Sequence, residues 1–177
     1  MLFPPLNRLG YAVKMLSRYL IVAILVVGFV LLSLDVAIAE DSKLNFTYSE
    51  LRNHDFSHQQ LQAASFARAD VRNSDFSGSD LSRSILTEGK FMNANLTGAN
   101  LSEAFMDQVD MSGADLSNAL LIEAIAPGTN FNGANITGAD FSGALLDRYQ
   151  TSELCKIASG TNLETGIDTR YSLNCKN

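Results

Sequence analysis

Residues 94–101 read Ala-Asn-Leu-Thr-Gly-Ala-Asn-Leu, and this stretch sets a five-residue period that continues far on both sides. Every fifth residue belongs to one series: Phe46, Leu51, Phe56, Leu61, Phe66, Val71, Phe76, Leu81, Leu86, Phe91, Leu96, Leu101, Met106, Met111, Leu116, Leu121, Ala126, Phe131, Ile136, Phe141 and Leu146. Twenty of these 21 positions hold a large apolar side chain, and only Ala126 is small. Because such side chains fill about a third of positions in ordinary proteins, chance does not produce the series.

The positions around each apolar residue are patterned as well. The residue two before it is mostly Ala, and the residue directly before it is mostly Asp or Asn, as in Ala114-Asp115-Leu116. A period of five is neither the 3.6 of a helix nor the 2 of a strand. It predicts a solenoid of short extended segments and turns. One large and one small side chain of each repeat then point inward, and backbone groups pair between successive coils.

The pattern of Ala, then Asp or Asn, then Leu or Phe, resembles that of the pentapeptide-repeat proteins over about residues 44–148. The resemblance implies an all-β solenoid, a right-handed quadrilateral β-helix in which four pentapeptides make one coil, and the 21 repeats make about five coils. At ~4.8 Å between paired strands, the rod is roughly 25 Å tall. Residues twenty positions apart then lie in one column along it.

Composition and charge exclude several classes of protein. The chain has 177 residues, 46% of them apolar and 18% charged, which excludes a disordered chain and a coiled coil. Its net charge of −6 disfavours a protein that neutralises nucleic-acid phosphates. The five-residue register places His54 inward and His58 near a turn, which disfavours a shared metal site. We therefore predict no catalytic residue, no cofactor and no metal site.

The N-terminal segment has the three parts of a secretory signal. Arg8, Lys14 and Arg18 precede sixteen uncharged residues, and a small-residue motif ends at Ala39. This pattern predicts a signal peptide over residues 1–39, an exported protein and no stable membrane insertion after cleavage. A retained anchor is the alternative, but sixteen helical residues span about 24 Å of a ~30 Å hydrocarbon core.

The five-residue period ends after Leu146, and the remaining residues are expected to cap the last coil with short helices. We expect these helices over 150–158 and 168–175, with Thr151 or Ser152 and Asp168 as N-caps. The predicted organisation is then a signal peptide over 1–39, a repeat β-helix over 40–148 and a C-terminal cap over 149–177.

Two cysteines lie in the predicted cap. Since the chain is expected to be exported, Cys155 and Cys175 predict a disulfide, and two cysteines without a nearby histidine make only half of a zinc site. The tail from Leu154 to Cys175 also resembles the cap of thylakoid-lumen pentapeptide proteins from plants and cyanobacteria. This second resemblance implies a location in the thylakoid lumen or a periplasm.

One outward column departs from the polar pattern of the others, and its members are Asn45, Ser65, Ile85, Phe105, Ile125 and Leu145. Leu120 and Ile122 fall on the adjoining side of the same coils. An outward apolar patch of this kind usually contacts something. Two interpretations stay open. The column packs beneath the cap or in a wider coil, or it is a face for protein binding or self-association.

Together these features predict a non-enzymatic exported scaffold or protein-interaction module. Its partner is an unidentified protein or a second copy of the chain, and it binds no nucleic acid. The alternative comes from another branch of the resembled family, whose acidic rods mimic duplex DNA and bind a topoisomerase. The signal peptide and the paired cysteines count against this alternative, because that target enzyme is cytosolic.

Overall fold

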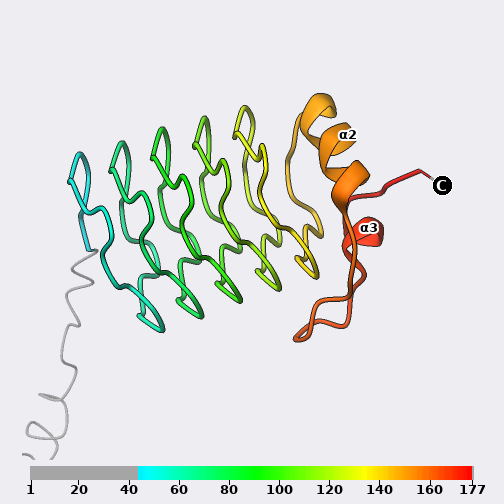
Figure 1. The fold of residues 1–177 in the computed structure, drawn as a ribbon, viewed down its shortest axis with the longest axis horizontal. Helices are drawn as coiled ribbons and strands as arrows, with labels where there is room; N and C mark the ends of the chain where they lie inside the picture. The colour runs from blue at the N-terminus through cyan, green and yellow to red at the C-terminus, as the bar shows by residue number, and fades with distance from the viewer. Residues whose placement is uncertain (1–43, 177) are drawn as a thin grey trace, which may run out of the picture. The chain divides into compact units, whose positions relative to one another are not determined.

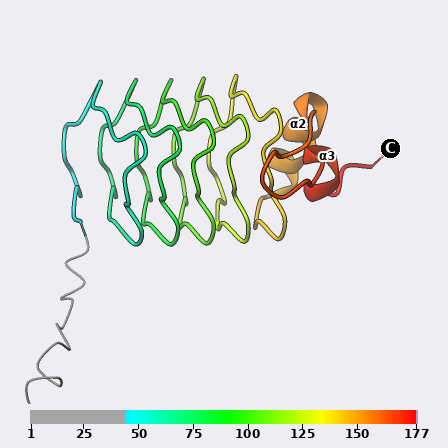
Figure 2. The ribbon, with the colours of Figure 1, turned by 90° about the horizontal axis from the view of Figure 1, so that it is seen from below.

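The computed structural model describes residues 44–176. The predicted signal peptide lies outside the described residues and stays a prediction. Up to Leu146 the described chain winds into a stack of similar coils, and the residues after it close one end of the stack (Figure 1, Figure 2). Over residues 44–176 no helix is both long and apolar enough to span a membrane.

The coils are joined by isolated parallel β-bridges rather than by long strands. Each bridge pairs a residue with the one twenty positions later, from Asn45 with Ser65 to Ile125 with Leu145. Because the bridges recur every five residues, a twenty-residue coil carries four of them and has four sides. The hundred residues from Asn45 to Leu145 thus make five coils. This register agrees with four pentapeptides per coil, and the right-handed sense of the coil stays a prediction.

Turn chemistry explains why Asp or Asn precedes each apolar residue. The carboxylate of Asp75 accepts the backbone N–H of Ser77 at 2.8 Å, and that of Asp80 accepts the N–H of Ser82 at 2.9 Å. Asp and Asn side chains suit this role because they reach the backbone two residues further on. The second turn residue has a positive φ, for example 63° at Gly98, which accounts for the recurrent glycines.

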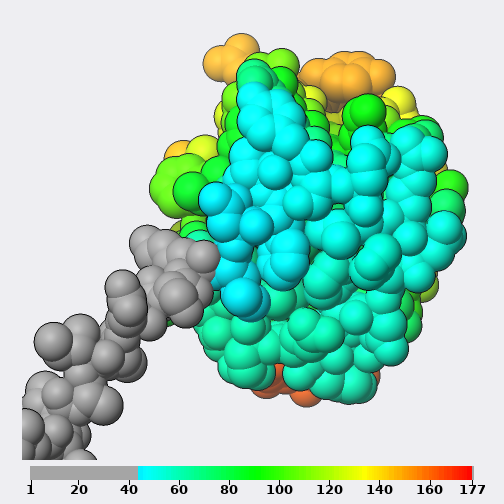
Figure 3. Space-filling model, turned by 90° about the vertical axis from the view of Figure 1, so that its left-hand side faces the viewer, coloured from blue at the N-terminus to red at the C-terminus, as the bar shows by residue number. Residues whose placement is uncertain are grey.

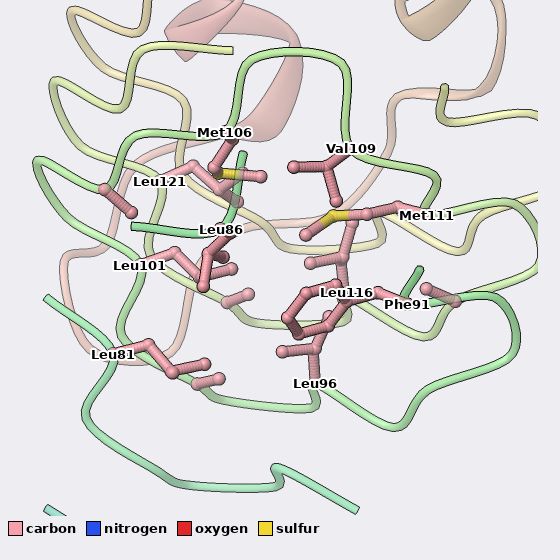
Figure 4. Close-up of a cluster of buried hydrophobic side chains, with 14 of the residues drawn as sticks. Leu81, Leu86, Phe91, Leu96, Leu101, Met106, Val109, Met111, Leu116 and Leu121 are labelled. Carbon is pink, nitrogen blue, oxygen red and sulfur yellow. The ribbon is translucent and has the colours of Figure 1, made fainter. Parts of the chain in front are cut away.

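The apolar series fills the interior of the stack. All of its members from Phe56 to Phe141 are buried. The rings of Phe56 and Phe76, twenty residues apart, are stacked with centroids 4.8 Å apart, and Phe66 meets Phe76 edge to face at 5.6 Å. Figure 4 shows later coils, where the labelled side chains, Phe91 among them, point into the same interior. The column geometry therefore builds one continuous core along the rod.

The N-terminal end of the stack is less well covered than the middle. Phe46 and Leu51 are only half-buried, and Figure 3 shows the first coil from this end. His54 is exposed here and not enclosed in the core as predicted, because no coil among the described residues covers this end. Its imidazole lies against Phe56, with ring centroids 6.1 Å apart.

Helix α2, Arg148–Ile157, opens the cap. Its N-cap is Asp147, whose carboxylate accepts the N–H of Gln150 at 2.8 Å, while the Gln150 side chain accepts the N–H of Asp147 at 2.7 Å. The predicted N-caps Thr151 and Ser152 are therefore wrong, because this reciprocal pair starts the helix earlier.

Helix α3, Thr169–Ser172, is shorter than the predicted 168–175. Its N-cap is Asp168, as predicted, and the Asp168 carboxylate accepts the N–H groups of Arg170 and Tyr171. A disulfide joins Cys155 in α2 to Cys175 after α3, with Cα atoms 5.6 Å apart.

The cap satisfies backbone groups of the last coils. The Gln150 side chain donates to the carbonyls of Ala126 and Thr129, both at 2.8 Å, and the Asn162 side chain donates to that of Gly138 at 2.9 Å. The hydroxyl of Ser172 accepts the N–H of Phe141 at 3.0 Å. Because an open coil presents unpaired backbone groups and apolar side chains, these bonds protect the C-terminal end of the rod.

Ser84 offers a test of the packing. Its side chain is fully buried and its hydroxyl has no hydrogen-bond partner. A buried hydroxyl without a partner gives up its hydrogen bonds to water and forms none in the folded protein. We therefore expect Ser84→Ala to raise the free energy of unfolding by about 1 kcal/mol. Urea denaturation measures this. Ser79→Ala is the matched control and should lower that free energy, because the Ser79 hydroxyl donates to the carbonyl of Phe76 at 2.8 Å. Equal effects of the two changes would contradict the expectation.

Candidate interaction surface

Four apolar side chains stand in one outward column of the stack. Successive bridges join Ile85 to Phe105, Phe105 to Ile125 and Ile125 to Leu145. We call these four residues the apolar stripe. The exposed fractions of Ile85, Phe105 and Leu145 are 44%, 49% and 61%, and Ile125 is half-buried. Since they are exposed with the cap in place, the interpretation that the cap covers this column is wrong.

Leu120 does not extend the stripe as predicted, whereas the prediction for Ile122 stays a prediction. Leu120 is only 8% exposed, and it is bridged to Asp140, which is buried. The Thr165 hydroxyl donates to the Asp140 carboxylate at 2.8 Å, so the segment between the two cap helices lies against this side of the stack. Leu120 is therefore part of the cap contact, which is a correction to the prediction. Ile122 is half-buried at the neighbouring turn.

Carboxylates border the apolar stripe on both edges. Glu103 and Glu123 each lie two residues before a stripe residue, and Asp107 and Asp147 each lie two residues after one. Glu103, Glu123 and Asp107 lie in the turns on either side of the stripe segments, at the corners that bound this side of the coil, and Asp147 is the N-cap of α2. Three of the four are exposed, Asp107 is half-buried, and none of them forms an ion pair within residues 44–176. We call them the rim carboxylates. The corresponding position in the earlier coil holds a base, Arg83.

The prediction from sequence missed the rim carboxylates, although a signal for them was present. Glu103 and Glu123 are twenty residues apart, so the column arithmetic that found the apolar stripe also places them side by side. The backbone agrees, because the N–H of Glu103 donates to the carbonyl of Ile122, directly before Glu123.

A separate cluster on the next side of the stack holds a buried carboxylate. Asp70 is 2% exposed and forms ion pairs with Arg72 and Arg52, each at 2.7 Å. The hydrogen bonds from Arg72, and then those from Arg52, hold the pKa of the Asp70 carboxyl well below its usual range, although burial acts to raise it. Both arginines are partly exposed. Arg52 is also paired with Glu50 at 3.3 Å, so the cluster joins two acids to two bases and stabilises the early coils.

The Asp70 cluster makes stability depend on pH. Because the pKa of Asp70 is lower in the folded than in the unfolded chain, its contribution is complete above about pH 4 and is lost as the pH falls further. We expect Asp70→Asn to lower the free energy of unfolding by about 3 kcal/mol at neutral pH and by less than half as much near pH 2, because the contribution is lost gradually as the pH falls below about 4. Thermal melts over this pH range, with the exposed Glu164→Gln as control, measure it. A deficit of equal size at neutral and at low pH would contradict the expectation.

From Asp75 on, the column opposite the apolar stripe alternates carboxylates with amides, whereas Asp55 in the first coil is bridged directly to Asp75. The Asn95 side chain donates to the Asp75 carboxylate at 3.0 Å, and the Asn135 side chain donates to that of Asp115 at 3.1 Å. Directly opposed like charges destabilise paired segments, and an amide between them replaces repulsion with a hydrogen bond. Asp75 and Asp115 are thus accounted for by the stacking of coils.

A groove of about 360 Å³ lies between α2 and residues 128–133 of the last coil. Tyr149 and Ile157 line it and are 72% and 49% exposed. Its charged lining residues are Asp147, which is also a rim carboxylate, and Glu153. The groove therefore begins where the apolar stripe ends. Nothing in the sequence pattern indicated it, because α2 lies outside the five-residue period.

Residues 44–176 contain no group of three His, Cys, Asp or Glu side chains placed to hold a metal ion. His54 and His58 both lie exposed on the first coil. The features that stand out in this part of the chain are therefore surfaces, namely the apolar stripe, its rim and the adjoining groove.

Comparison with known proteins defines the class. The family model "Pentapeptide repeats (8 copies)" matches residues 42–78, 74–113 and 114–148. The chain belongs to the pentapeptide-repeat family. This match is to a repeat family and indicates no catalytic one.

Two relatives from Arabidopsis thaliana are similar to this chain. A solved structure of a pentapeptide repeat protein from the thylakoid lumen is 36% identical, covers 72% of this chain and 89% of that chain, and superposes with a TM-score of 0.71. The chloroplastic thylakoid lumenal protein TL20.3 is 60% identical over 40 residues, which are 23% of this chain. The match spans only 14% of the length of TL20.3. Both relatives are lumenal, which confirms the predicted localisation, an exported protein of the thylakoid lumen or a periplasm.

Proposed function

We propose that the protein is a non-enzymatic exported scaffold that binds another protein through the apolar stripe. One observation carries the proposal. Four apolar side chains stack on an outward column, and the cap leaves three of them more than two-fifths exposed. Contiguous exposed apolar patches on soluble proteins usually mark interaction sites. At ~4.8 Å per coil, the four residues extend about 14 Å along the rod.

The proposed organisation gives each part of the chain a task. The signal peptide over 1–39 directs export and is removed. The right-handed repeat β-helix over 40–148 presents the apolar stripe on a rigid support, and the cap over 149–177 closes the end. A site held on a packed core keeps its geometry better than a site on loops, which favours a scaffold.

The test replaces the middle of the stripe. We expect Phe105→Ser with Ile125→Ser to abolish recovery of a partner when the native protein is purified from its own compartment, and to abolish any dimer seen by light scattering. The control, Leu163→Ser with Tyr171→Ser, changes two residues of the cap that are 85% and 77% exposed. It should leave partner recovery and the mass from light scattering unchanged. Partner recovery and mass equal to wild type in the stripe variant would overturn the proposal.

The alternative, a DNA mimic that binds a topoisomerase, gains no support from the acidic columns. Duplex DNA carries about one uncompensated charge per 1.7 Å of its axis. In this rod Asp70 is paired with two arginines, and Asp75 and Asp115 accept hydrogen bonds from asparagine amides. These columns do not form a continuous negative surface.

A further inference from the structure

We propose that the occupant of the apolar stripe is an amphipathic helix that carries basic residues along both flanks of its apolar face. This inference rests on the proposed function and names the chemistry of the partner. It follows from three features of the surface, which are the charge of its rim, the spacing of its apolar residues and the groove at its end.

The rim is negative beside Phe105, Ile125 and Leu145, and within residues 44–176 Arg83 is the one base at an edge position, beside Ile85. Glu103 and Glu123 stand along one edge of the stripe, and Asp107 and Asp147 along the other. Within the described residues these four carboxylates have no ion-pair partner, in contrast to Asp70 and Glu88, which are paired with arginines. The Asp147 carboxylate also caps α2, so Glu103, Glu123 and Asp107 are the ones that most need a partner's charge. A partner with lysine or arginine on both sides of an apolar ridge would pair with both edges at once. Complementary charges of this kind favour the correct partner and speed its association.

The spacing of the stripe selects a helix over a strand. The four residues follow the coil spacing of ~4.8 Å, so the stripe measures about 14 Å from end to end. Residues on one face of a helix recur about every turn of 5.4 Å, and four of them span about 16 Å. Residues on one face of a strand recur every 6.6–6.8 Å, and four of them span roughly 20 Å. A helix laid along the rod therefore keeps its apolar residues in register with the stripe, whereas a strand does not.

The groove beside α2 continues the surface. Asp147 belongs both to the rim and to the groove lining, and the exposed Tyr149 and Ile157 extend the apolar area beyond Leu145. No lysine or arginine lines this groove. Glu153 is paired with Lys156 at 2.6 Å, so the groove offers a helix longer than the stripe mainly a second apolar surface, through Tyr149 and Ile157.

The rim disfavours two other occupants. In a symmetric dimer through the stripe, the rim carboxylates of one copy would face those of the other, because both edges are acidic. Like charges placed opposite one another destabilise an interface. An anionic membrane surface would be repelled for the same reason. Both occupants are outcomes of the experiment below.

The experiment measures binding of synthetic helical peptides to the full exported chain by fluorescence anisotropy. Three peptides share leucines at one helical face and differ only in their flanks, which carry lysine, glutamine or glutamate. We expect the lysine peptide to bind at least tenfold more tightly than the glutamate peptide, with glutamine between them. Raising the salt from about 50 mM to about 500 mM should remove most of this difference, because exposed charges are screened.

Matched variants separate the role of charge from that of the apolar stripe. Glu103→Gln with Glu123→Gln should weaken binding of the lysine peptide about fivefold and leave the glutamine peptide unchanged. The control, Asp55→Asn with Glu164→Gln, removes the same charge from exposed positions elsewhere. It should change the affinity of neither the lysine peptide nor the glutamine peptide. Phe105→Ser with Ile125→Ser should abolish binding of all three peptides.

Several results would overturn the inference. If the three peptides bind equally, or if none binds while native partner recovery still depends on Phe105, the basic helix is wrong but the proposed function stands. A concentration-dependent dimer that Phe105→Ser abolishes, or binding to vesicles of anionic lipid, would replace the helix with one of the disfavoured occupants. If the stripe variant behaves as wild type in every assay, the proposed function falls as well.

Discussion

Phe76→Ala is expected to lower the free energy of unfolding by about 4 kcal/mol, the largest effect of any single substitution in the rod. Phe76 is fully buried and its ring meets those of Phe56, Phe66 and Phe91 with centroids 4.8 to 5.6 Å apart. The truncation removes these contacts and leaves a cavity that the coils above and below cannot fill. The parallel bridges fix the coil spacing, so the backbone collapses little around the gap.

Denaturant unfolding followed by circular dichroism measures this loss. Leu163→Ala is the control, because Leu163 is 85% exposed and its truncation should change the free energy by less than about 0.5 kcal/mol. If Phe76→Ala costs under 1 kcal/mol, the aromatic column is not a packed core.

Removal of the disulfide is expected to have the second largest effect. Cys155→Ser with Cys175→Ser should lower the stability of the cap by about 3 kcal/mol, since the bond closes a loop with a sequence separation of 20. The effect should be local. The N–H groups of Gly138 and Phe141 are bonded to Ser159 and Ser172 of the cap, so they depend on its docking.

Hydrogen exchange resolves this local effect. In the serine variant the amides of Gly138 and Phe141 should exchange faster, while that of Phe76, bonded to Asn95 within the coils, should keep its protection. The wild-type protein treated with a reductant should behave in the same way. Uniform loss of protection along the rod would show instead that the disulfide supports the whole stack.

The coils were predictable because the same five-residue pattern repeats along the chain, and each repeat buries its apolar residue in the same way. Residues such as Met106 and Leu116 are buried because of their position in the five-residue period. Their burial can be predicted without knowing which distant residues they contact. The apolar stripe was predictable for the same reason, since a fixed coil length converts linear spacing into contact. The exceptions lie at the first coil, where His54 has no coil beneath it among the described residues and is exposed.

The cap was less predictable because no period governs it. Its N-cap, Asp147, competes with Thr151 and Ser152, and the choice depends on the reciprocal bond with Gln150. Leu120 occupies an outward position, and it is buried only because a non-repetitive segment folds back and Thr165 bonds to Asp140. Such long-range docking depends on a few polar side chains that leave no pattern in the sequence.

The proposed partner surface depends on one geometric claim, which is that each residue lies over the residue twenty positions before it. Cysteine pairs on the side opposite the apolar stripe test it most directly, with a short thiol cross-linker and analysis by mass spectrometry. We predict that Asp75→Cys with Asn95→Cys is cross-linked efficiently, because these two residues are bridged. Asp75→Cys paired with Lys90→Cys or with Asn100→Cys should not react, and preferential linkage of either pair would mean a coil of three or of five sides and would contradict the claim.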